Sequence, residues 1–146
     1  MDFYIGSDHA GYKLKQAVKK YLDEKEHKYT DLGSFNGEDS VDYPDIAREV
    51  AEKVQEYPET MGIMICGTGQ GSAMVLNRHK KIRAALCNTE ELAELAREHN
   101  HANVLCLGER TTDEDLAIKI VDKFINTPVS ADERHKRRVD MFDNHN

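Results

Sequence analysis

The amino-acid sequence alternates short apolar runs with segments of helical periodicity from one end to the other. Each of five apolar runs is followed within a few positions by glycine, asparagine or another turn-forming residue. The runs are Phe3–Ile5, Lys28–Leu32, Gly62–Cys66, Ile82–Cys87 and Val104–Leu107. Such an alternation is typical of a parallel sheet covered by helices. We therefore predict an α/β fold in which a five-stranded parallel sheet is flanked by helices.

Between these runs, apolar residues recur with the period of an amphipathic helix. The expected buried faces comprise Leu14, Ala17, Val18, Tyr21 and Leu22; Ile46, Ala47, Val50, Ala51 and Val54; Leu92, Ala93, Leu95 and Ala96 within 89–99; and Leu116, Ala117, Ile120, Val121, Phe124 and Ile125 within 113–126. Thr112 and Asp115 predict a capping box, and a further helix is expected to start near Ser72. Pro128 separates the last of these helices from the polar segment 130–146.

Length and charge exclude several classes of protein. The 146 residues suit one domain, 1–146, with its own core. The balance of 20 Lys and Arg against 27 Asp and Glu gives a net charge of −7, which repels nucleic-acid phosphates. No apolar run approaches the roughly 18–20 residues that cross a bilayer, and the N-terminal residues lack a charged leader and a cleavage site. We expect a cytoplasmic protein that binds neither nucleic acid nor membranes.

Reactive side chains gather directly after the predicted strands. In an open parallel sheet, ligands bind beyond the carboxyl ends of the strands, where loops lead into helices. The segments at that edge are Gly6–Gly11, Cys66–Gly71, Cys87–Thr89 and Gly108–Arg110. They contain more reactive groups than the turns at the amino edge, so we expect the site at the carboxyl edge.

Three alternate glycines, Gly67, Gly69 and Gly71, predict a turn that aims several N–H groups at one point before a helix. Such a loop binds an anion or a developing oxyanion. It lacks the Lys of a nucleotide-triphosphate loop, and Ser72 stands where a dinucleotide loop needs glycine and where a cysteine phosphatase needs arginine. The alternative is a turn that only connects strand to helix, which three glycines beside a thiol disfavour.

Cys66 precedes this loop and the start of a helix, a position that lowers the pKa of a thiol. It is a candidate thiolate base or nucleophile, whereas Cys87 and Cys106 suit the role of small buried hydrophobes. The odd number of cysteines and the absence of a C-x-x-C pair favour free thiols. The spacing of Cys66, His99 and His101 matches no familiar metal site, so we expect neither a metal nor another cofactor.

Other polar residues are weaker candidates. Asp8 and His9 follow the first strand and can orient a sugar hydroxyl, meet a phosphate or cap a helix. His99 follows a covering helix and is expected at the amino edge, away from Cys66. Arg134 and Arg138 stand four residues apart in a basic cluster, a spacing that suits either a phosphate site or a solvated helix face.

Taken together, the motifs resemble those of the type B ribose-5-phosphate isomerase family, which is related to the galactose-6-phosphate isomerase subunits. The segments that carry the resemblance are Gly6–Gly11, Asp42–Pro44, Cys66–Gly71, Ile82–Ala84, His99–Asn100, Asn103–Leu105 and Arg134–His135 with Arg138. The resemblance implies a three-layer, Rossmann-like fold, no cofactor, and a homodimer or a tetramer with sites between subunits. It also assigns segment 130–146 to the phosphate site and the dimer contact.

The resemblance further implies interconversion of ribose 5-phosphate and ribulose 5-phosphate in the pentose phosphate pathway. Cys66 would be the base, with Thr68 near the thiol, and His99, from the partner subunit, would open the sugar ring. The loop Gly67, Thr68, Gly69, Gln70 and Gly71 would hold the enediolate, Asp8 and Asn100 would bind sugar hydroxyls, Tyr43 would line the pocket, and His9, Arg110, Arg134 and Arg138 would bind the phosphate. One branch of the family uses a Glu after the last glycine as base; Ser72 places this chain in the cysteine branch.

Alternatives stay open at this point. An allose-6-phosphate or galactose-6-phosphate isomerase would use the same residues on a six-carbon sugar. A Cys–His hydrolase would use Cys66 as nucleophile and His99 as base. A regulatory module would bind a sugar phosphate without turnover.

Overall fold

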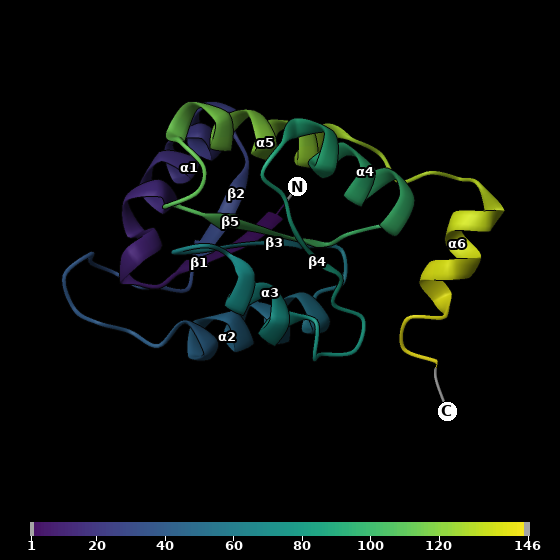
Figure 1. Cartoon of the computed structure of the whole chain (residues 1–146), viewed down its shortest axis with the longest axis horizontal. Helices are drawn as coiled ribbons and strands as arrows, with labels where there is room; N and C mark the ends of the chain where they lie inside the picture. The colour runs from purple at the N-terminus through teal and green to yellow at the C-terminus, as the bar shows by residue number, and fades with distance from the viewer. Residues whose placement is uncertain (1, 145–146) are drawn as a thin grey trace.

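The computed structural model describes residues 2–144 and contains one parallel sheet, as predicted (Figure 1). Its strands are β1 (Asp2–Ser7), β2 (Lys28–Asp31), β3 (Met61–Cys66), β4 (Ala84–Leu86) and β5 (Val104–Gly108), in the order β2-β1-β3-β5-β4. All five apolar runs form strands. The β4 strand starts later than predicted because the Ile82 N–H bonds to His79 in a turn and the side chain of Asn77 holds the N–H and C=O groups of Ala84.

Helices cover both faces of the sheet, which makes three layers (Figure 1). One face carries α1 (Tyr12–Glu24), α4 (Glu90–Asn100) and α5 (Glu114–Asn126), and the other carries α2 (Tyr43–Glu56) and α3 (Gln70–Leu76). A short 3-10 helix, η1 (His9–Gly11), precedes α1. The predicted apolar faces pack into two cores, one on each side of the sheet. The predicted three-layer α/β architecture is confirmed.

Two helix starts differ from the prediction. The N-cap of α5 is Asp113, whose side chain accepts from the Leu116 N–H, so the predicted Thr112–Asp115 capping box is wrong. The Thr112 side chain is instead buried and does not cap the helix. The α3 helix starts at Gln70, two residues before Ser72, because Gly69 adopts a left-handed conformation with φ of 81° and serves as its N-cap.

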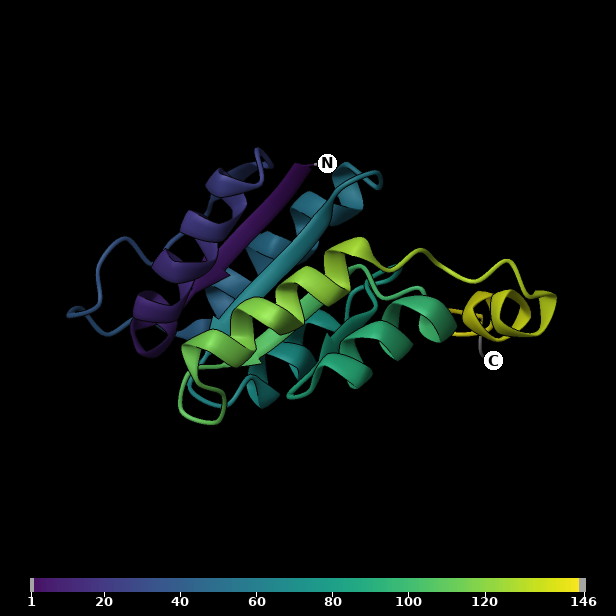
Figure 2. The same cartoon turned by 90° about the horizontal axis from the view of Figure 1, so that it is seen from above.

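The C-terminal segment leaves the three layers. Helix α6 (Glu133–Asp140) lies at one end of the molecule and contacts α4, while the loop of residues 32–42 lies at the opposite end (Figure 2). Most of the predicted segment 130–146 is therefore α6 and its flanks, with residues 145–146 outside the described part. Within residues 2–144, no helix combines the length and apolar character that crossing a membrane requires.

Candidate active site

A pocket of about 280 Å³ opens at the carboxyl edge of the sheet. It lies where the strand order reverses, because β1 leads outward to β2 while β3 lies on the other side. This switch point is where open α/β sheets bind their ligands. The pocket is lined by Asp8, His9, Ala10, Tyr43, Cys66, Gly67, Thr68, Gly71 and Arg110. The structure thus brings eight predicted site residues together.

Cys66 ends β3 and lies at the inner wall of this pocket, with its side chain buried. The Gly69 N–H donates to Cys66 Sγ over 3.1 Å. The left-handed backbone of Gly69 turns this amide back toward the end of the strand. A donor in this position can stabilise negative charge on sulfur. The glycine loop therefore directs an N–H group at the thiol, as its predicted position before the helix implies.

The other two cysteines have different surroundings. Cys87 and Cys106 are buried among apolar residues. Burial raises the pKa of Cys87 to about 12 and also raises the pKa of Cys106. Both thiols are therefore protonated near neutral pH, as expected for small buried hydrophobes.

Tyr43 and Arg110 close the pocket from two sides. Tyr43 starts α2, and its ring packs so closely on Gly71 that a Cβ atom at residue 71 would overlap it. The Arg110 N–H donates to the Gly67 carbonyl over 2.9 Å, and its guanidinium lies beside Gly67. Arg110 is exposed, so its charge is available to an anion that enters the pocket.

Asp8 and His9 form the β1 side of the pocket. Asp8 is buried, and its Oδ1 accepts from the Gly11 N–H over 3.0 Å. It therefore caps η1, which is one of the roles predicted for it from the sequence. The Nδ1 of His9 accepts from the Val41 N–H over 3.2 Å. A neutral imidazole that accepts at Nδ1 carries its proton on Nε2. His9 therefore offers a donor to a ligand in the pocket.

Four predicted site residues lie at the opposite edge of the sheet. His99 and Asn100 end α4, and the imidazole of His99 packs on that of His135 in α6, with 4.2 Å between ring centroids. Arg134 and Arg138 share α6 and are exposed. The intervening strand β5 has five residues, so at about 3.3 Å per residue the two edges lie about 17 Å apart. Within one chain, this His99 cluster is separate from Cys66.

Gln70 does not line the pocket. Its side chain is exposed and lines a separate hollow with Met74 and Leu86. The buried Gly69 contacts the thiol through its backbone amide rather than by lining the pocket.

Across residues 2–144, no group of three or more His, Cys, Asp or Glu side chains is arranged to hold a metal ion.

Two supporting contacts of the site were not predicted from the sequence. Glu109 follows β5, and its carboxylate accepts from the Leu14 N–H over 2.7 Å, which ties β5 to the first turn of α1. Val41 lies in the loop before α2 and reaches His9. Both contacts join segments that are far apart in the chain, so no local pattern predicts them.

The geometry defines an α/β protein with a thiol and a glycine loop at the switch point of a parallel sheet. The chain belongs to the ribose/galactose isomerase family, whose model matches residues 3–142. A ribose-5-phosphate isomerase B from Mycolicibacterium paratuberculosis is 38% identical over 142 residues, which is 97% of this chain and 89% of the relative.

Solved structures agree with this assignment. A ribose 5-phosphate isomerase from Thermotoga maritima has a TM-score of 0.94 and 42% identity, and the match covers 99% of this chain and 98% of that one. A ribose-5-phosphate isomerase B from Mycoplasma genitalium with bound ribulose-5-phosphate has a TM-score of 0.90 and 42% identity, covering 95% of this chain and 91% of that one. The family predicted from the motifs is confirmed.

Proposed function

We propose that this chain is an aldose–ketose isomerase that interconverts ribose 5-phosphate and ribulose 5-phosphate. The observation that carries the proposal is Cys66, whose sulfur accepts the Gly69 N–H at the wall of a pocket that also contains Asp8, His9 and Arg110. Family membership and the relative with bound ribulose-5-phosphate support this substrate over a six-carbon one.

In the proposed reaction, a Cys66 thiolate removes the proton from C2 of the open-chain aldose. The electron pair of that C–H bond moves into the C1–C2 bond, and the negative charge develops on O1. The glycine loop and the first turn of α3 supply N–H groups at this edge of the sheet, which suits stabilisation of the enediolate. The proton then returns to C1, and proton exchange between the two oxygens completes the ketose. Thr68 lines the same pocket beside the thiol.

The pocket also has groups that suit a phosphate. Arg110 and the Nε2–H of His9 are a cation and a donor that line the same pocket. Asp8 accepts one hydrogen bond within its own helix turn and keeps acceptor capacity for a sugar hydroxyl. The pocket thus offers complementary groups to both ends of a sugar phosphate.

A second copy of the chain would complete this site. Ring opening needs an acid or base beside the sugar, and the His99 cluster of one chain lies at the opposite edge of the sheet from Cys66, about 17 Å away along the strands. We infer a homodimer in which His99, Asn100, Arg134 and Arg138 of one subunit reach the pocket of the other. A pair of such dimers as a tetramer, and a location in the cytoplasm, stay predictions from the sequence.

An apolar surface supports this pairing. In residues 2–144, β4 pairs only with β5, so its outer edge has no neighbouring strand. Three large apolar side chains on β4 and on the helices before and after it are exposed, namely Met74 at 60%, Leu86 at 38% and Leu92 at 45%. They come from α3, β4 and α4, which are the elements that link the Cys66 loop to His99. A second copy that covers this surface would bury them.

The direct test is conversion of ribose 5-phosphate to ribulose 5-phosphate in the presence of a chelator. Cys66→Ala is expected to lower kcat by about 100-fold or more, because positioned acid–base groups contribute roughly 10²–10⁴-fold each. Cys87→Ala, which removes another buried thiol, is the matched control and should keep its activity. Full activity in Cys66→Ala would refute the role of the thiol. A folded native protein without turnover would instead favour a six-carbon substrate or a binding module.

Subunit mixing tests the shared site. Cys66→Ala and His99→Ala proteins are each expected to be inactive. After subunit exchange between equal amounts, half of the dimers are mixed, and each contains one intact site, so about a quarter of native activity should return. No recovery after exchange has been verified by native mass spectrometry would contradict the shared site. Light scattering distinguishes the dimer from the tetramer.

A further inference from the structure

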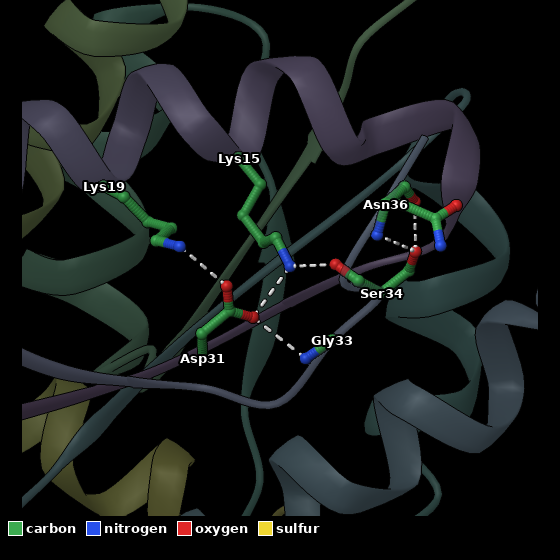
Figure 3. A network of polar contacts seen from close by, with 6 residues as sticks. All are labelled: Lys15, Lys19, Asp31, Gly33, Ser34 and Asn36. Atoms are coloured by element: carbon green, nitrogen blue, oxygen red, sulfur yellow. Dashed lines mark hydrogen bonds and ion pairs between the residues drawn. The ribbon is translucent and has the colours of Figure 1, made fainter. Parts of the chain in front are cut away.

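A buried lysine lies outside the pocket, beneath the loop that leads to it. Lys15 belongs to α1, and its side chain is 0% exposed. Its ammonium group contacts Asp31 Oδ1 at 2.7 Å and donates to the Ser34 carbonyl over 2.5 Å (Figure 3). A buried charge is costly unless it is paired and hydrogen-bonded, so this side chain is held in one place.

The contacts of Lys15 fix the start of the loop of residues 32–42. Asp31 Oδ1 also accepts from the Gly33 N–H over 2.9 Å, and the Ser7 N–H donates to the Gly33 carbonyl over 2.7 Å. Asp31 therefore holds Gly33, Lys15 holds Ser34, and Ser7 bonds the same turn to the end of β1. Ser34 Oγ then bonds to Asn36, which continues the network into the loop (Figure 3).

The far end of the same loop reaches two residues of the candidate site. Val41 donates its N–H to His9 Nδ1, and the loop ends at Asp42, the N-cap residue of α2, directly before Tyr43. Residues 32–42 contain no helix or strand, so their position depends on such anchors. Asn36 Oδ1 adds local turns by accepting from the N–H groups of Glu38 and Asp39. The contacts of Lys15 with Asp31 and Ser34, here called the Lys15 clamp, are the buried anchor of this segment.

We propose that Lys15 is a positioning residue of the active site: through the 32–42 loop it holds the Val41 amide against His9, which keeps His9 as the Nε2–H donor for the substrate phosphate. This inference rests on the proposed function for its substrate. It assigns Lys15 no contact with the sugar.

The test compares Lys15→Met with Lys19→Met. Methionine has a similar length but neither charge nor donor. Lys19 is the matched control because it also pairs with Asp31, at 2.9 Å, lies four residues away on the same helix, and has no contact with Ser34. Lys15→Met is expected to raise the KM for ribose 5-phosphate about 10-fold or more while kcat changes less, because one phosphate donor is lost and Cys66 is untouched. Lys19→Met should keep the native KM.

Two readouts are independent of turnover. Nitrogen NMR of labelled histidine should show His9 as the Nε2–H tautomer in the native protein and in Lys19→Met, and as a tautomer mixture in Lys15→Met. Amide hydrogen exchange should become faster at residues 34–42 only in Lys15→Met. Because neither readout needs catalysis, both would still test the clamp if ribose 5-phosphate proved not to be the substrate.

A native tautomer, native exchange and native KM in folded Lys15→Met would overturn the proposal. Lower stability without any change in these three properties would mean that Lys15 has a structural role only, which also overturns it. If Lys15→Met does not fold, Asp31→Asn weakens the same clamp with little change in shape. Unchanged His9 tautomer and KM in Asp31→Asn would then refute the inference, and a shift in both would support it.

Discussion

Substitution of Gly69 by alanine should damage stability and catalysis together. Gly69 has a φ of 81°, a left-handed conformation that costs a residue with a Cβ about 1–2 kcal/mol. The added Cβ would also lie 2.5 Å from Leu86 Cδ1 and 3.1 Å from the carbonyl atoms of Leu107. Such overpacking typically costs about 1–3 kcal/mol. The free energy of unfolding should therefore fall by about 2–5 kcal/mol, a large part of the roughly 5–15 kcal/mol of a typical domain.

The same change should also lower kcat, because it weakens the hydrogen bond that stabilises negative charge on the Cys66 sulfur. Relief of the clash with the β5 backbone requires residue 69 to move, and its N–H is the donor to Cys66 Sγ. Loss of a hydrogen bond to a charged group costs about 1.5–3 kcal/mol, which corresponds to about a 10- to 150-fold fall in kcat. Denaturant unfolding measures the first effect, and initial rates measure the second.

A double-mutant cycle with Leu86→Ala separates the causes. The cycle compares Gly69→Ala with and without Leu86, so the cost of the Leu86 truncation itself cancels. In that background the clash with Leu86 is gone, whereas the left-handed strain and the contact with Leu107 persist. Gly69→Ala should then cost less, but still more than about 1 kcal/mol. A cost below about 0.5 kcal/mol in the native background, with unchanged kcat, would refute this reasoning.

Two further predictions concern stability. Asp113→Ala should lower the free energy of unfolding by about 1 kcal/mol because it removes the side-chain cap of α5. It should also speed amide hydrogen exchange in the first turn of α5, whereas Thr112→Ala should leave that exchange unchanged because Thr112 does not cap the helix. Equally fast exchange in both variants would contradict the assignment of Asp113 as the cap. For Asp31, burial raises the pKa, but hydrogen bonds from Lys15, the Gly33 amide and Lys19 outweigh it and hold the pKa below 3.8. Its stabilisation is therefore complete above pH 3.8 and is lost as the pH falls through the lower folded value. The difference in unfolding free energy between the native protein and Asp31→Asn should shrink in that acid range, and a constant difference would disprove the linkage.

Local patterns predicted the elements and the neighbourhood of the thiol. Cys66 and its glycine loop are adjacent in sequence, so their contact needed only a strand followed by a helix. The amino-edge position of His99 also followed from strand–helix alternation, because a helix that returns from one strand to the next must end at that edge. The capping error at Thr112 arose because Asp113 is an equally good capping residue.

The supporting contacts could not be predicted in this way. Lys15 lies next to the apolar face of its helix, and nothing local indicates that its ammonium is buried against Asp31. The packing of Tyr43 on Gly71 and the bond from Val41 to His9 depend on how the loop between β2 and α2 crosses the sheet edge. Each of these contacts joins segments that only the folded chain brings together. Local sequence patterns therefore do not show which residues meet.

Helix α6 has eight residues, and none of them is buried within one chain. Isolated helices this short are marginal in water, because too few hydrogen bonds offset the cost of nucleation. The order of α6 therefore depends on its contact with α4 and, in the proposed homodimer, on contacts with the neighbouring subunit. Dilution that separates subunits would then unravel the segment that carries Arg134 and Arg138, so specific activity would fall with protein concentration before the sheet itself unfolds.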